Sequence, residues 1–348
     1  MNDRGPNTFK VVQLNAENLF LFLDDLTPRE WRKLSEKEWQ KLSNATTPNK
    51  SLVKTLWLAD TVQTINADIV CLNEVGGQES ITNFCKFFLN GKYTPHLIEG
   101  NSDRGIDIGY LVKKDFAKKV ELRTHKDRPL QFLYPHEIES NVHWAQTAPE
   151  KVVKTHYFSR DCAELRIYNS DDSKPSLIIL LVHLKSKLDP EGIDPGGRSR
   201  REAEMRTLMQ IYKELRSEFL SVPMMVAGDF NGFASKANLA DEFKDLAATD
   251  LESVVDLAGL SSEAAATQLQ FSRNGQINNL EIDYIFISPE LKPHLIKESV
   301  EVFRYRSDLG LPLPLPKTLE QRMAMPSDHY PVVATFTDFF NYRFFEGA

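Results

Sequence analysis

Eight short apolar runs constrain the fold more than any other feature of this sequence. They are spread from residue 9 to residue 336, and many of them are apolar throughout instead of alternating with polar residues. Strands of this kind need cover on both faces of their sheet. We therefore predict buried strands at Phe9–Leu14, Asp68–Asn73, Ile106–Val112, Ala163–Tyr168, Leu177–His183, Pro223–Gly228, Glu281–Ser288 and Pro331–Phe336.

Two amphipathic segments between these runs predict helices. Ser51–Asn66 and Arg198–Leu220 both carry apolar residues three and four positions apart, which places them on one helical face. Strands that alternate with helices are typical of an α/β protein. The chain shows no internal repeat and no long linker, so we predict one domain over residues 1–348, with insertions at 24–50 and 124–160. Leu309–Lys317 repeats Leu-Pro and predicts an extended loop.

Composition and charge argue against several classes of protein. No apolar segment approaches the length that crosses a bilayer. The three cysteines have no Cys-x-x-Cys spacing, which favours buried thiols over disulfides or zinc ligands. A net charge of −7 argues against a general basic surface for nucleic acid, although a bound cation would offset acidic ligands. The N-terminus shows no signal peptide, which favours the cytoplasm, but a trimmed secreted protein would look the same.

Polar clusters stand where several predicted strands end. Gly-Asp-Phe-Asn-Gly follows one strand at 228–232, and Pro-Ser-Asp-His-Tyr-Pro precedes another at 326–331. Loops on a rigid scaffold often carry catalytic groups. Carboxylate oxygens bind divalent metal ions, and an imidazole exchanges a proton near neutral pH. These groups together favour hydrolysis of a phosphate ester, although each one alone has a structural explanation as a turn, cap or core residue.

Six motifs in a fixed order decide between these interpretations. Asn-x-x-Asn-Leu-Phe, Asp-Ile-Val-x-Leu-x-Glu-Val, His-Leu-Lys-Ser, Gly-Asp-Phe-Asn, Ile-Asp-Tyr-Ile-Phe and Ser-Asp-His-x-Pro-Val follow one another along nearly the whole chain. This series resembles the endonuclease/exonuclease/phosphatase superfamily, which includes deoxyribonuclease I-like and exonuclease III-like enzymes. The resemblance implies a four-layer α/β sandwich, in which two packed mixed β-sheets are flanked by helices. A monomer is the default that it implies.

The resemblance also implies a metal site. Glu74 falls on the principal metal ligand of the family, and Asn15 falls on a residue that helps to hold metal or phosphate. Asp328 would support the same site. Oxygen ligands of this kind suit Mg²⁺, with Mn²⁺ as the alternative, and do not suit zinc.

The catalytic groups follow from the same comparison of motifs. His329 would be the catalytic histidine, and Asp283 would orient it. Asp229 would position or deprotonate the attacking water, Asn231 would bind a phosphate oxygen, and His183 would donate to the phosphate. The sequence leaves open which residue is the general base.

The substrate is less constrained than the reaction. Arg104 and Arg160 precede predicted strands beside the expected cleft, and Lys185 begins a basic loop, so all three are candidates to contact substrate phosphate. A solvated basic loop is the alternative for Lys185. We favour a nuclease that hydrolyses DNA or RNA phosphodiesters, with a phosphatase or phosphodiesterase for a small or lipid phosphate ester as the alternative and a non-catalytic binding protein as a remote one. Segment 124–160, with four histidines, is either a lid or a plain surface excursion.

Overall fold

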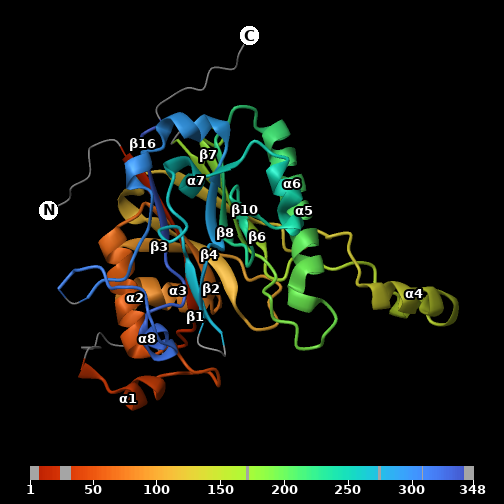
Figure 1. Cartoon of the computed structure of the whole chain (residues 1–348), viewed down its shortest axis with the longest axis horizontal. Helices are drawn as coiled ribbons and strands as arrows, with labels where there is room; N and C mark the ends of the chain where they lie inside the picture. The colour runs from red at the N-terminus through yellow and green to blue at the C-terminus, as the bar shows by residue number, and fades with distance from the viewer. Residues whose placement is uncertain (1–7, 24–32, 170–171, 273–275, 308, 341–348) are drawn as a thin grey trace, which may run out of the picture.

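Two six-stranded mixed sheets form the centre of the molecule (Figure 1). The computed structural model describes residues 8–23, 33–169, 172–272, 276–307 and 309–340, so residues 24–32 of the predicted insertion at 24–50 lie outside the described residues. The first sheet has the order β15 (Glu301–Val302), β16 (Val332–Thr337), β1 (Thr8–Leu19), β2 (Ile69–Val75), β4 (Asp107–Lys113) and β3 (Tyr93–Leu97). The second has the order β11 (Glu252–Ser253), β14 (Asp283–Ile287), β8 (Met224–Asp229), β7 (Leu177–His183), β6 (Cys162–Tyr168) and β5 (Lys119–Thr124).

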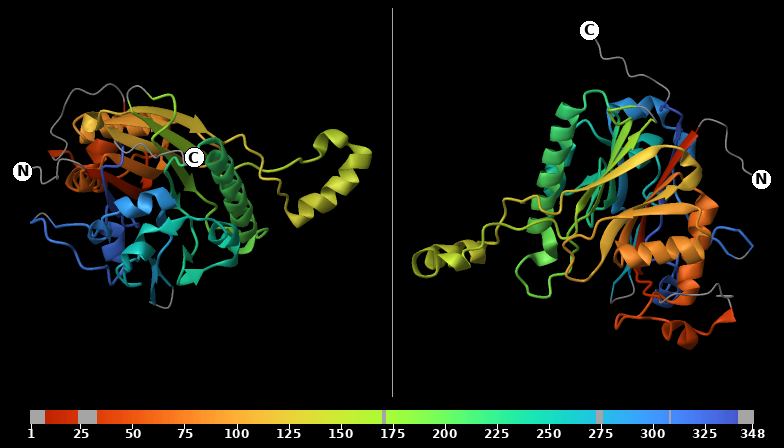
Figure 2. Two further views of the ribbon diagram at one scale, coloured as in Figure 1. Left: turned by 90° about the horizontal axis from the view of Figure 1, so that it is seen from above. Right: turned by 180° about the vertical axis from the view of Figure 1, so that it is seen from behind.

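The side chains of each central strand alternate between two cores. Val11 of β1 and Leu181 of β7 meet in the core between the sheets. The next residue of β1, Val12, packs against α2 (Leu52–Ile65), and Leu180 of β7 packs against α5 (Arg198–Glu218). Because successive strand residues point to opposite faces, each sheet is covered on both sides. The layers are therefore helix, sheet, sheet and helix (Figure 2), which confirms the predicted four-layer fold.

The predicted helix at 51–66 shows how local sequence sets the limits of an element. The Ser51 hydroxyl caps the first turn by accepting a bond from the Lys54 amide, as Ser does at helix starts. The helix ends at Asn66, whose φ of 52° is left-handed, a conformation that Asn tolerates better than most residues. The remaining helices and hairpins are α1 (Glu36–Gln40), α3 (Gly77–Asn83), α4 (Pro135–Thr147), α6 (Lys244–Ala247), α7 (Val254–Ala258), α8 (Leu319–Ala324), β9 (Ala234–Ser235), β10 (Asn238–Leu239), β12 (Gln268–Phe271) and β13 (Ile277–Leu280). In the described part of the chain, no helix combines the length and the apolar character that a bilayer crossing requires.

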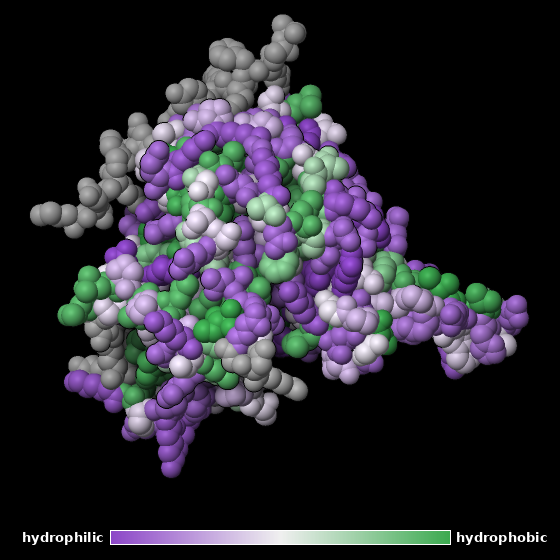
Figure 3. All heavy atoms as spheres, viewed as in Figure 1, coloured by the Kyte–Doolittle hydropathy of each residue, from purple (hydrophilic) through white to green (hydrophobic). Residues whose placement is uncertain are grey.

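The segment at 124–160 leaves the sandwich as an arm between β5 and β6 and carries α4 (Figures 1 and 2). Every residue of α4 is at least partly exposed, including Ile138 at 52% and Val142 at 65%. Figure 3 accordingly shows apolar surface along the arm. No apolar residue of α4 belongs to the hydrophobic cores of the described part of the chain, and the arm joins the helix to the body at its base.

Strand directions bring the polar strand ends to one edge of the sandwich. β1 runs parallel to β2, and β7 runs parallel to β8, so their last residues lie at the same end. β14 is antiparallel to β8 and β16 is antiparallel to β1, so the residues at their beginnings reach that end too. In register, Asp229 lies between His183 on one side and Asp283 on the other. The fold thereby gathers the predicted site residues without any long loop.

Gly228 permits the close pairing of β7 and β8 directly before Asp229. Its φ is 150°, and a Cβ there would lie 2.0 Å from the carbonyl oxygen of Val182. We expect Gly228→Ala to lower the free energy of unfolding by about 3 kcal/mol or more, because backbone strain and a backbone clash combine. Gly259→Ala is the matched control, since Gly259 also has a positive φ but a Cβ there meets open space. Urea denaturation measures both, and equal losses would contradict the clash.

Candidate active site

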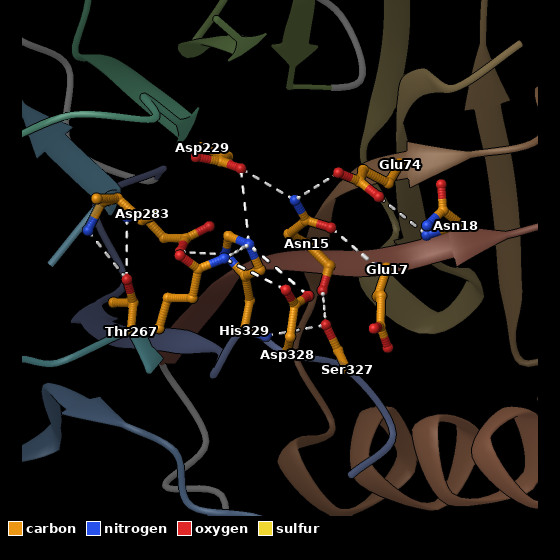
Figure 4. Close-up of polar contacts among 12 residues, drawn as sticks. Asn15, Glu17, Asn18, Glu74, Asp229, Thr267, Asp283, Ser327, Asp328 and His329 are labelled. Carbon is orange, nitrogen blue, oxygen red and sulfur yellow. Dashed lines mark hydrogen bonds and ion pairs between the residues drawn. The ribbon is translucent and has the colours of Figure 1, made fainter. Parts of the chain in front are cut away.

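The strand ends enclose a cleft of about 400 Å³ at one edge of the two sheets. Asn15 and Asp283 lie behind its wall, where both are almost fully buried. Figure 4 shows Asn15, Glu74, Asp229, Asp283, Asp328 and His329 converging from both sheets. The predicted catalytic and metal-binding residues that line the cleft directly are Glu74, His183, Asp229, Asn231, Asp328 and His329.

The side chain of Asn15 connects the two sheets. Its Nδ2 donates to Asp229 Oδ2 at 3.0 Å and contacts Glu74 Oε1 at 3.4 Å, while its Oδ1 accepts from the Glu17 amide at 2.9 Å. Glu74 Oε2 also accepts from the Asn18 amide at 3.0 Å. Glu74 has a φ of 60°, an uncommon conformation for a residue with a side chain, of the kind that gathers at functional sites. Asn15 therefore fixes the two carboxylates relative to each other.

His329 is held by a carboxylate behind it. Its Nδ1 lies 2.7 Å from Asp283 Oδ2, so the pair fixes the ring with Nε2 toward the cleft. Nε2 lies 3.9 Å from both Asp229 Oδ2 and Asp328 Oδ1. Burial alone would lower the pKa of His329, but the carboxylates of Asp283, Asp328 and Asp229 outweigh it and raise that pKa well above 6.5. The three carboxylates therefore favour the protonated form of the ring.

Asp229 has a higher pKa than an ordinary surface carboxylate. Burial and the nearby charge of Asp283 raise its pKa to about 7, although the Asn231 amide and Asn15 donate to it. A carboxylate that binds a proton near neutral pH has the property that a general base requires. The site thus places a carboxylate with a raised pKa 3.9 Å from the His329 ring.

His183 is a buried, neutral histidine at the same edge. Burial, followed by the charges of Arg160 and His329, lowers its pKa well below 6.5. Its Nε2 lies 3.6 Å from Asp229 Oδ2, and its Nδ1 finds no hydrogen-bond partner within the described residues. A neutral ring can still donate one N–H to a phosphate oxygen, and that role of His183 stays a prediction.

Four further residues shape the site, and sequence reasoning missed them. The Gln268 amide of β12 lies 2.8 Å from His329 Nε2, and Arg322 of α8 forms a charged hydrogen bond with Asp328. Lys50 is buried beside the acidic residues of the site, where burial lowers its pKa to about 8. None of these first three residues belongs to a recognisable motif. Asn73 did have a signal, since it is polar within an apolar strand; it accepts from the Asp229 amide at 3.1 Å and donates to the Val182 carbonyl at 2.9 Å.

The three basic residues predicted to contact phosphate do not all line the catalytic cleft. Arg104 and Arg160 line the cleft, and Arg160 is only 6% exposed. Lys185 lines an adjoining cavity instead, with its Nζ donating to the carbonyl oxygens of Ser186 at 3.3 Å and Leu188 at 2.5 Å. Two of the three therefore face the same space as Glu74 and His329.

The donor groups of the site suit a hard divalent ion. Asp229, Asp283 and His329 offer one ligand atom each, all within 4.8 Å of one another, so this trio can hold a metal ion. The hydrogen bond between Asp283 and His329 competes with that use. Glu74 and Asp328 line the same cleft, and oxygens such as theirs are preferred by Mg²⁺ and Mn²⁺.

The fold and this set of acidic and imidazole groups define a class of hydrolases. The chain belongs to the endonuclease/exonuclease/phosphatase family, whose model matches residues 52–329. No curated protein sequence matches the chain.

Three solved structures illustrate the likeness in fold. Truncated TDP2 of C. elegans is 17% identical with a TM-score of 0.54, over 95% of this chain and 98% of that one. TDP2 of D. rerio, complexed with a single-strand DNA product, is 14% identical with a TM-score of 0.55, over 95% and 99%. The human Nocturnin catalytic domain with bound sulfate is also 14% identical with a TM-score of 0.55, over 95% and 94%. At these identities the likeness shows the fold alone.

Proposed function

We propose that the chain is a metal-dependent nuclease that hydrolyses phosphodiester bonds of DNA or RNA. The observation that carries the proposal is an opposed pair in one cleft: the Asp229 carboxylate, whose pKa burial raises, lies 3.9 Å from Nε2 of His329, and Asp283 holds the other side of that ring at 2.7 Å. A pair of titratable groups whose surroundings shift their pKa values is characteristic of sites that use acid and base catalysis. The single-strand DNA product bound to the D. rerio relative agrees with such a substrate.

Each residue has a proposed task. Asp229 takes the proton of the attacking water, and Asn15 holds that carboxylate in place. Asn231 and His183 donate to phosphate oxygens, while Asp283 orients His329 to offset negative charge on the reacting phosphate. Mg²⁺ held by Glu74 and Asp328 would polarise the phosphoryl oxygen as a Lewis acid.

A small phosphate ester is the second candidate substrate, because a cleft of about 400 Å³ can enclose one. A panel of substrates with Mg²⁺ separates the two: supercoiled plasmid, single-stranded DNA, RNA, bis(p-nitrophenyl) phosphate and inositol phosphates. We expect cleavage of the nucleic acids and of the diester dye. Release of phosphate from a monoester, with every diester left intact, would replace the nuclease by a phosphatase.

The rate should depend on pH in a bell-shaped manner. Below about pH 7 Asp229 binds a proton and cannot accept one from water, so kcat/KM falls toward acid. At high pH His329 loses the proton that its raised pKa retains, so kcat/KM falls again. Asp283→Asn removes the largest of the charges that raise the pKa of His329, and it should move the alkaline limb to lower pH. Rates on bis(p-nitrophenyl) phosphate measure both limbs; a flat profile from about pH 5 to pH 9 would contradict the assignment.

A further inference from the structure

A second cavity of about 540 Å³ adjoins the catalytic cleft and has no task in the proposed reaction. Its walls come from the loop that precedes β4, the base of the α4 arm, the loop that follows β7 and the first turn of α5. Arg104, Arg160, Ser186 and Leu188 line both cavities, so the two spaces share a wall. A substrate longer than one phosphate ester can extend from one into the other.

Two arginines of the second cavity each have an Nε group that makes no hydrogen bond within the described residues. Arg160 is 94% buried, as its exposure of 6% implies, and its Nε has no hydrogen-bond partner within the described residues. Arg200 donates from Nη2 to the Tyr157 carbonyl at 2.9 Å, and its Nε lies 3.7 Å from Glu204 Oε1, beyond hydrogen-bond distance. Burial and the charges of Arg160 and Arg200 lower the pKa of Lys185. Arg104, Arg160, Lys185 and Arg200 therefore line the same cavity.

The acidic residues nearby are mostly engaged with the backbone. Buried Glu204 accepts from the amides of Ser159 at 2.8 Å and Lys185 at 2.6 Å, which fixes the chain directly before Arg160 and directly after β7. Asp194 accepts from the amides of Ser199 and Arg200 at the start of α5. Glu137 forms hydrogen bonds with His156 and with the Tyr134 amide. Asp189 accepts hydrogen bonds from the amides of Ile193 and Asp194. Asp103 and Glu191 are exposed to solvent.

The other wall of the cavity is aromatic. The rings of Tyr134 and His136 stack at 5.8 Å with 12° between their planes, and His156 meets Tyr134 edge-on at 5.3 Å. Tyr134 is buried, whereas His136 is exposed, so the stack is open at its histidine end. Flat rings beside guanidinium groups are what single-stranded nucleic acid requires, because its bases stack on rings and its phosphates bind Arg.

We propose that this cavity binds the nucleotide next to the scissile phosphodiester of a single-stranded nucleic acid, with its phosphate on Arg200 and Arg160 and its base on the His136–Tyr134 stack. A base within a duplex is already stacked and cannot reach these rings without being turned out. The proposal rests on the proposed nuclease function and deepens it, because it names an unpaired strand as the substrate. It also gives the base of the α4 arm a task in substrate binding.

The test compares a substrate that fits the catalytic cleft alone with one that extends beyond it. Bis(p-nitrophenyl) phosphate is the first, and single-stranded DNA and RNA oligonucleotides are the second. In Arg200→Ala and His136→Ala, we expect the ratio of kcat/KM for oligonucleotide to kcat/KM for the diester dye to fall about tenfold, mainly through KM. Lys213→Ala removes an exposed charge from the same helix, and we expect no change in that ratio.

The salt dependence of KM distinguishes the phosphate contact of Arg200 from base stacking on His136. Arg200→Ala should reduce the slope of log KM against log salt by about one, as loss of one phosphate contact does, while His136→Ala should leave the slope unchanged. Ratios equal to the parent's in both variants would overturn the proposal. A parent protein that turns over the dye but cleaves no oligonucleotide would instead overturn the nuclease function. His136 is exposed, so its variant remains informative if Arg200→Ala fails to fold, which thermal unfolding would reveal.

Discussion

His329→Ala is expected to lower kcat by about 10²–10⁴-fold, the usual contribution of one positioned acid–base group. The side chain is the only described imidazole held by Asp283, at 2.7 Å, and its Nε2 faces Asp229 and Asp328. Alanine removes an imidazole whose protonated form three carboxylates favour. Initial rates on single-stranded DNA and on bis(p-nitrophenyl) phosphate, at saturating Mg²⁺, measure the loss.

Two further variants show whether the loss is chemical. Asp283→Asn keeps the size of the side chain but removes the charge that fixes the histidine tautomer, so kcat should fall by a large factor there too, as it does in other carboxylate–histidine pairs. His143→Ala changes an exposed histidine on α4, and its rate should equal that of the parent. A His329→Ala protein that is folded by circular dichroism and keeps its rate within about threefold would remove His329 from the mechanism.

The central strands could be predicted because burial on both faces leaves a plain mark in the sequence. Leu177–His183 is buried at all seven positions, and its predicted limits agree with β7. The edge strands lack that mark. β5 is half exposed along its length, and β3 contains Pro95, which is tolerated at an edge because one side of the strand has no partner. Sequence reasoning missed both strands for this reason.

The candidate site could be predicted as a set of residues but not as a set of contacts. Motif order identified Asn15 and Glu74, yet only the pairing of β1 with β2 and the packing of the second sheet against the first show that the Asn15 amide nitrogen faces the carboxylates of Glu74 and Asp229. Gln268 and Arg322 reach the site from a hairpin and a short helix whose apolar patterns are weak. Their contribution depends on tertiary structure alone. The individual catalytic roles stay predictions until variants are measured.

Glu74→Gln should abolish most of the Mg²⁺-dependent rate, about 10³-fold, because charge stabilisation by a catalytic metal contributes several kcal/mol. Glu74 lines the cleft with one oxygen near Asn15 and His183 and the other bonded to the Asn18 amide. The glutamine keeps this shape but removes the negative charge that a divalent ion requires. Binding of Mg²⁺ to the folded chain should raise Tm in the parent protein and not in the variant, which gives a measurement independent of activity.

The same measurement separates the two places where the ion can be held. If Glu74 and Asp328 hold it, Asp283→Asn keeps the Mg²⁺-induced rise in Tm, because Asp283 is occupied with His329 at 2.7 Å. If Asp229, Asp283 and His329 hold it, Asp283→Asn loses the rise and Glu74→Gln keeps it. Glu139→Gln removes an exposed charge from α4 and serves as the control for net charge. Loss of the rise in Asp283→Asn alone would therefore contradict the assignment to Glu74, because a carboxylate engaged with His329 can bind the ion only after that hydrogen bond breaks.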